Sequence, residues 1–144
     1  MSPRLEYALS TGALALALTV LVCLALDMGA RNPFPWALGT TAGVAALLAA
    51  TWVCGWRWLA SATPSARRLA VLVLGTVAVA MALFFPLCVA LVAALSPQGD
   101  VSDWLHGAGV FGVFALVFGT LPALLTTIPL AWRFLRRHDR AVRA

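Results

Sequence analysis

Four long apolar runs dominate the sequence, and none of them has an Asp, Glu, Lys, Arg or His near its centre. They cover approximately residues 7–26, 36–56, 69–95 and 107–132. A helix rises about 1.5 Å per residue, so about 20 apolar residues are enough to cross the roughly 30 Å hydrocarbon core of a bilayer. The pattern therefore predicts an all-α, polytopic membrane protein with four transmembrane helices in a single domain, residues 1–144.

The composition argues against the alternatives to a membrane protein. Of the 144 residues, 62% are hydrophobic and 10% are charged, whereas soluble domains average about 45–50% apolar and about 25% charged residues. A small domain keeps a large ratio of surface to volume, so it could not hide this many apolar side chains from water. A soluble monomer, a disordered chain and a nucleic-acid-binding domain are therefore poor interpretations, despite the net charge of +5.

The positive charges are all arginines, and they lie at the ends of the apolar runs. If the chain crosses a membrane four times, every arginine except Arg31 falls on one side. These are Arg4, Arg57, Arg67, Arg68, Arg133, Arg136, Arg137, Arg140 and Arg143. Because positively charged residues are retained in the cytoplasm, we expect both termini to be cytoplasmic. The absence of lysine, with abundant Ala, Leu and Val, is typical of a GC-rich bacterial genome, so we expect the bacterial cytoplasmic (inner) membrane.

The first apolar run could also be interpreted as a cleaved signal peptide. Its apolar stretch is longer than the roughly 7–15 residues of a typical signal, and no good small-x-small cleavage site follows it. We therefore expect an uncleaved span. The breaks between the runs, at 32–35, 61–68 and 96–100, contain the Pro and Gly residues that end helices.

Two of the predicted spans carry small residues at helical spacing. The second span contains Gly39, Gly43, Ala46 and Ala50. The fourth contains Gly112, Ala115, Gly119 and Ala123, beside a bulky stripe of Phe111, Phe114 and Phe118. Within lipid, small residues allow helix backbones to approach closely. The sequence leaves two uses open, since these faces could hold the four spans together or could meet another subunit.

Prolines interrupt the third and fourth runs, and each removes one backbone hydrogen-bond donor. They are Pro86, Pro122 and Pro129. The carbonyls expected to lose a donor belong to Ala82, Phe118 and Leu125. Hydroxyl groups that could compensate for the loss belong to Thr120, Thr126 and Thr127. Such a helix could act as a hinge or line a cavity, or the prolines could simply be tolerated.

Polar clusters outside the runs are few. Asp100, Asp103 and His106 have spacings of three residues in the predicted outer loop, and could bind a divalent cation. Alternatively, the acidic residues cap the following helix. The segment 107–112 fits G-x-G-x-x-G, but it lacks the preceding strand and the later acidic residue of a dinucleotide site.

No cofactor is predicted. Cys23, Cys54 and Cys88 form no Cys-x-x-Cys motif, so we expect buried thiols. The two histidines, His106 and His138, lie at or beyond opposite membrane edges, which disfavours an intramembrane haem.

The C-terminal segment 133–144 is predicted to be a basic cytoplasmic tail. Its arginines are Arg133, Arg136, Arg137, Arg140 and Arg143. Anionic lipid headgroups attract such residues by about 1 kcal/mol each near the surface. The tail could therefore face lipid headgroups, or it could serve only to fix the orientation.

The sequence shows no nucleophile–base pair and no intramembrane charge, so we expect a protein that is not an enzyme. The small-residue faces favour a packing or scaffold subunit of a homo- or hetero-oligomeric membrane complex, with lipid and other membrane helices as partners and no nucleic acid. The alternative is a transporter or channel-like protein for a small neutral or hydrophobic solute. That alternative rests on the threonines and prolines of the fourth span.

Overall fold

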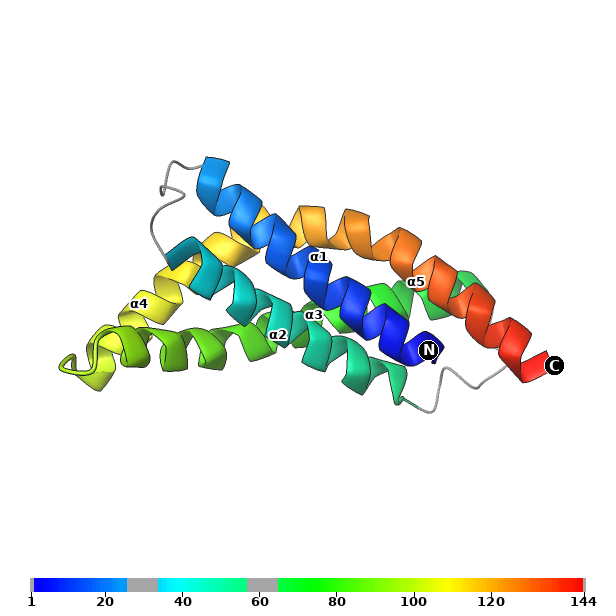
Figure 1. Ribbon diagram of the computed structural model, residues 1–144, viewed down its shortest axis with the longest axis horizontal. Helices are drawn as coiled ribbons and strands as arrows, with labels where there is room; N and C mark the ends of the chain where they lie inside the picture. The colour runs from blue at the N-terminus through cyan, green and yellow to red at the C-terminus, as the bar shows by residue number, and fades with distance from the viewer. Residues whose placement is uncertain (1, 26–33, 57–64, 144) are drawn as a thin grey trace.

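The computed structural model describes residues 2–25, 34–56 and 65–143, and it is helical almost throughout (Figure 1). The helices are α1 (Pro3–Ala25), α2 (Phe34–Cys54), α3 (Ser65–Leu95), α4 (Val101–Phe114), a π-helix η2 (Ala115–Gly119) and α5 (Thr120–Arg143). Because α4, η2 and α5 follow one another without a break, the described residues form four helices that are long and apolar enough to cross a membrane. The expectation of an all-helical chain with four such helices is confirmed. Arg31 and Arg57 lie outside the described residues.

The helix starts follow from local chemistry. Pro3 and Pro35 lie in the first turns of α1 and α2, where a missing backbone N–H removes no intrahelical hydrogen bond. At α4, Asp100 is the N-cap: its side chain accepts a hydrogen bond from the Val101 N–H at 2.8 Å. Such caps satisfy N–H groups that the first turn leaves without partners.

The helices extend beyond the predicted apolar runs. Helix α5 continues through the predicted tail to Arg143, since charged side chains outside an apolar layer are compatible with helix. Pro86 and Pro129 lie inside α3 and α5 without ending either helix. Pro122 falls in the first turn of α5, directly after η2.

Both chain termini lie at the same end of the bundle, together with the start of α3 (Figure 1). We call this the arginine-rich end, because Arg4, Arg67, Arg68 and the arginines of α5 belong to it. The opposite end holds the turn between α3 and α4. Helices α1 and α2 pack most extensively against each other, and α3 packs beside α2.

The rod formed by α4, η2 and α5 is bent near η2 (Figure 1). π-Segments and prolines are common causes of helix bends. The buried apolar core is correspondingly divided into two clusters. One, at the arginine-rich end, includes Tyr7, Val53, Leu72 and Phe134. The other, toward the opposite end, includes Leu38, Phe84 and Ala108.

Candidate binding cavity

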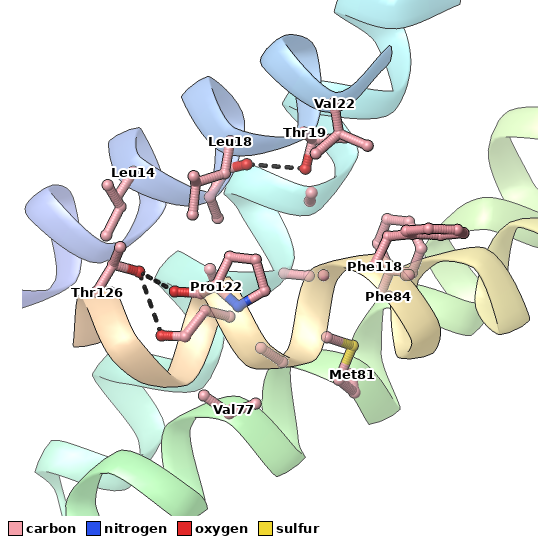
Figure 2. A pocket seen from close by; sticks show the side chains of 18 of the residues that line it. Leu14, Leu18, Thr19, Val22, Val77, Met81, Phe84, Phe118, Pro122 and Thr126 are labelled. Atoms are coloured by element: carbon pink, nitrogen blue, oxygen red, sulfur yellow. Dashed lines mark hydrogen bonds between the residues drawn. The ribbon is translucent and has the colours of Figure 1, made fainter. Parts of the chain in front are cut away.

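A cavity of about 130 Å³ lies inside the bundle, between the two core clusters, and all four long helices contribute to its walls. Figure 2 shows side chains from α1, α3, η2 and α5 that point toward it, among them Leu18, Met81 and Phe118. Helix α2 contributes Leu38 and three alanines, at 42, 45 and 46. The bend of the rod thus lies at the wall of this cavity.

The walls of the cavity are apolar, and the described residues that line it include none with a charged side chain. Leucine, valine, methionine, phenylalanine and alanine supply most of the surface. The polar lining groups are the hydroxyls of five threonines and the Cys23 thiol. The threonines are Thr11, Thr19, Thr76, Thr126 and Thr127.

Four of these threonine hydroxyls donate to the carbonyl four residues earlier in their own helix. The oxygen–oxygen distances are 2.7 Å from Thr11 to Tyr7 and 2.8 Å from Thr19 to Ala15. They are 2.7 Å from Thr126 to Pro122 and 2.6 Å from Thr127 to Ala123. The fifth, Thr76, shares a buried hydrogen bond of 3.1 Å with the Tyr7 hydroxyl.

The expected compensation of the proline breaks by threonine is wrong. Thr126 and Thr127 donate to Pro122 and Ala123, and not to the carbonyls of Phe118 or Leu125. A helical threonine reaches the carbonyl three or four residues before it, and neither Phe118 nor Leu125 stands at that distance. The Thr120 hydroxyl oxygen is buried without a hydrogen-bond partner.

The small residues of α2 pack within the chain, against α1. A Cβ placed on Gly43 would lie 3.1 Å from the Gly12 carbonyl oxygen, and one on Gly12 would lie 3.0 Å from the Gly43 carbonyl oxygen. A Cβ on Gly39 would lie 2.6 Å from Val20 Cγ2. Ala46 and Ala50 are buried as well. We call this contact the α1–α2 seam.

Gly12, the partner of Gly43 in this seam, was not predicted from the sequence. Its signal was available, because Ala8 and Gly12 have a spacing of four, and both are buried. Close packing of helices at small-xxx-small spacings is a general pattern.

The small residues of the rod formed by α4, η2 and α5 have different surroundings. Ala115, Gly119 and Ala123 line the cavity. A Cβ on Gly119 would lie 3.9 Å from Met81 Cε, and one on Gly112 would lie 3.5 Å from Phe85 Cδ2. These distances are ordinary van der Waals contacts, so this face approaches no backbone closely.

Two of the candidate cation ligands, Asp100 and Asp103, cap the N-terminus of α4. The Asp100 N–H donates to Asp103 Oδ2 at 3.3 Å, and the Ser102 hydroxyl donates to Asp100 Oδ2 at 3.3 Å. The Asp103 N–H in turn donates to the Asp100 side chain, so Asp100 and Asp103 form a reciprocal capping box. His106 joins no such arrangement with them, and the described residues contain no group of three His, Cys, Asp or Glu side chains placed to hold a metal ion.

The arginines of the predicted tail make specific contacts. Arg133 Nη2 lies 3.0 Å from Glu6 Oε1, and Arg137 pairs with the other oxygen of the same carboxylate. The Arg136 guanidinium lies 3.7 Å from the centre of the Trp132 ring. Glu6 thus attracts two of the arginines that were expected to face lipid headgroups, whereas Arg140 is exposed.

A second ion pair joins α3 to α5. Arg68 Nη2 lies 3.0 Å from Asp139 Oδ1, and the Arg68 side chain is only 11% exposed. Glu6 and Asp139 were not predicted from the sequence as partners of arginine. Their signal was their placement, because a four-span order puts both acidic residues at the arginine-rich end.

The walls of the cavity are chemically compatible with a small uncharged molecule. Apolar walls stabilise such a ligand by about 25 cal/mol for each Å² of apolar surface removed from water. Cys23, Cys54 and Cys88 are buried free thiols, and Cys23 lies at the cavity wall. Comparison of the chain with protein-family models, curated protein sequences and solved structures found no match.

Proposed function

We propose that this chain is a membrane protein that binds a small, uncharged and mainly apolar molecule inside its helical bundle, as a transporter of such solutes would. The observation that carries the proposal is the cavity of about 130 Å³, to which all four long helices contribute uncharged side chains. A dry, apolar cavity of roughly 150 Å³ is known to accommodate benzene. The expected ligand is therefore about the size of one six-membered ring.

The bent rod supports movement of the ligand as a second step. The π-segment Ala115–Gly119 and Pro122 lie directly at the cavity wall. A helix interrupted in this way changes its bend at lower cost than a regular helix, because fewer backbone hydrogen bonds must break. Straightening or further bending of the rod would close or open the cavity.

We also propose that the protein spans the bacterial cytoplasmic membrane four times with both termini in the cytoplasm. Support comes from four helices of sufficient length and hydropathy. It also comes from the arginines near both chain ends, such as Arg4 and Arg136, since positive residues are retained in the cytoplasm. A green fluorescent protein fused to the C-terminus should fluoresce in a bacterial host, and its export in a non-fluorescent form would contradict this orientation.

The scaffold role expected from the sequence stays a prediction. It was motivated by two small-residue faces, and both are turned inward: Gly43 packs on α1, and Gly119 borders the cavity. A scaffold role would therefore have to use another surface of the protein.

Binding is tested with toluene as the probe and the Met81 methyl group as the reporter, because Met81 lines the cavity. The protein, with 13C-labelled methionine methyl groups, is placed in lipid nanodiscs and titrated, and a Met81→Leu variant assigns the signal. We expect a saturable shift of the Met81 signal.

The matched variants are Gly119→Leu and Gly109→Leu. Leucine at 119 has room to enter the cavity, whereas a Cβ at Gly109 meets nothing within 4 Å and Gly109 does not line the cavity. The shift should disappear in Gly119→Leu and persist in Gly109→Leu. A shift that never saturates, or that is the same in both variants, would overturn the proposed function.

A further inference from the structure

Among the polar groups that line the cavity, free hydrogen-bond acceptors outnumber free donors. A threonine hydroxyl has one proton to donate and two lone pairs that accept. In Thr11, Thr19, Thr126 and Thr127 that proton is already directed at a backbone carbonyl, over distances of 2.6–2.8 Å. A carbonyl can only accept, so the direction of these four bonds is fixed. Each hydroxyl oxygen keeps acceptor capacity, but none of the four has a proton left.

The remaining polar groups change this balance little. The Thr76 oxygen is bound to the Tyr7 hydroxyl at 3.1 Å; one of the two groups donates there, so this pair keeps one proton, against four threonines that keep none. The Cys23 thiol is a weak donor. Figure 2 shows two of the four donating threonines, Thr19 and Thr126, on opposite walls with their bonds drawn to their own helices.

Exchanging one of these bonds for a bond to a ligand brings no net gain. In apolar surroundings the threonine proton has no water to turn to, so it leaves its carbonyl only for an acceptor atom of the ligand, and one hydrogen bond then replaces another. At these four threonines a ligand with only acceptor atoms, such as a ketone or an ether, is therefore satisfied only by breaking a bond. A ligand with an O–H or an uncharged N–H would be satisfied without breaking any.

On the basis of the proposed function above, we propose that the cavity selects a hydrogen-bond donor: a small apolar molecule that carries a hydroxyl or an uncharged N–H group. The ring or chain of the ligand fills the apolar part of the cavity. Its donor group binds a lone pair of a threonine oxygen, and those of Thr126 and Thr127 lie beside the bend of the rod.

Three probes of similar size separate this inference from the proposed function. Cyclohexanol can donate and accept, cyclohexanone can only accept, and methylcyclohexane can do neither. Dissociation constants are measured from the Met81 methyl signal in lipid nanodiscs, and each is corrected for the partition of the probe into nanodiscs without protein. One net hydrogen bond corresponds to an affinity difference of about two- to tenfold, so cyclohexanol should bind tighter than cyclohexanone by about that factor.

A double variant locates the acceptors. Thr126→Val with Thr127→Val keeps the side-chain shape and removes both oxygens, so cyclohexanol should lose most of its advantage while methylcyclohexane binds as before. Thr41→Val is the matched control, because Thr41 donates to the Ala37 carbonyl at 2.9 Å but does not line the cavity. Circular dichroism during heating checks that both variants are folded.

The outcomes are distinguishable. If none of the three probes binds, the proposed function fails, and this inference fails with it. If all three bind with equal affinity, or if cyclohexanone binds tighter than cyclohexanol, the cavity binds apolar molecules without selecting a donor and only this inference is overturned. An advantage of cyclohexanol that survives in the double variant would also contradict it, because the assigned acceptors would be the wrong ones.

Discussion

The α1–α2 seam and the rod formed by α4, η2 and α5 carry the same kind of sequence signal, glycine and alanine at spacings of three and four. The small residues form a close backbone contact in the seam and a cavity wall in the rod. In the seam the two backbones touch, since Gly12 and Gly43 each leave space for the carbonyl oxygen of the other. In the rod, Gly119 has no neighbour closer than ordinary van der Waals distance and borders a cavity. The spacing of small residues therefore identifies a helix face, but does not determine what that face meets.

The two regions also differ in where they are held. The seam is tight in its middle, where α1 and α2 cross at Gly12 and Gly43. The rod is held at its ends, by Phe134 in the core cluster of the arginine-rich end and by Ala108 in the other cluster. The five residues of η2, all of them described, include none that is buried. A rod attached at both ends and open in its middle is what leaves room for a ligand.

The largest effect is expected from a large side chain in the seam. Gly43→Leu places a side chain where its Cβ would lie 3.1 Å from the Gly12 carbonyl oxygen, and a backbone oxygen cannot move aside as a flexible side chain can. We expect a loss of at least about 3 kcal/mol in the free energy of unfolding, or no folded protein. Unfolding by SDS in mixed micelles measures it. Unchanged stability would mean that α1 and α2 do not pack at these glycines.

The second largest effect on stability should come from the ion pair that joins the C-terminal part of α5 to α3. Asp139→Asn removes the carboxylate that lies 3.0 Å from Arg68, whose side chain is only 11% exposed. Because a largely buried guanidinium would lose its charged partner, we expect a loss of about 1–2 kcal/mol. The same unfolding assay measures this loss. Arg140→Gln, at an exposed arginine of the same helix, is the control and should change stability little.

A smaller and opposite effect is expected at the open middle of the rod. Gly119→Leu should stabilise the protein by about 1 kcal/mol, because leucine favours helix more than glycine does and fills apolar space. The contrast with Gly43→Leu is the sharpest test of the comparison, since the substitution is the same and the expected signs differ. Destabilisation of similar size at both positions would show that the rod is packed as tightly as the seam.

Much of this arrangement could be predicted from the sequence, for reasons that are local. A run of apolar residues reveals a long helix because the signal is contained in the run itself, and the four expected helices are present. The start of α4 could be anticipated in the same way, since Asp100 and Asp103 act within one turn. The alternative use of these acidic residues as cation ligands needed a third group from elsewhere.

The relations between helices could not be predicted, because they depend on rotation and register. Spacing placed Gly39 and Gly43 on one face, but whether α1 or another subunit covers that face depends on how the helices turn toward each other. Likewise, prolines marked the fourth span as irregular, but not that Pro122 would follow a π-segment at the wall of a cavity. The hydrogen bonds of Thr126 and Thr127 were predicted wrongly, because a threonine hydroxyl in a helix reaches only the carbonyl three or four residues before it.

The smallest effect concerns the attachment of the rod to α1. Glu6→Gln removes the charge shared by Arg133 and Arg137, both of which are substantially exposed. Solvent and salt screen such pairs, so we expect a loss of no more than about 1 kcal/mol, and a smaller loss in 0.5 M salt than in low salt. Unfolding by SDS is unsuitable in high salt, so heating followed by circular dichroism measures this change. A loss that is independent of salt would indicate that Glu6 acts through packing rather than charge, and the end of the rod would then be held in the same way as the seam.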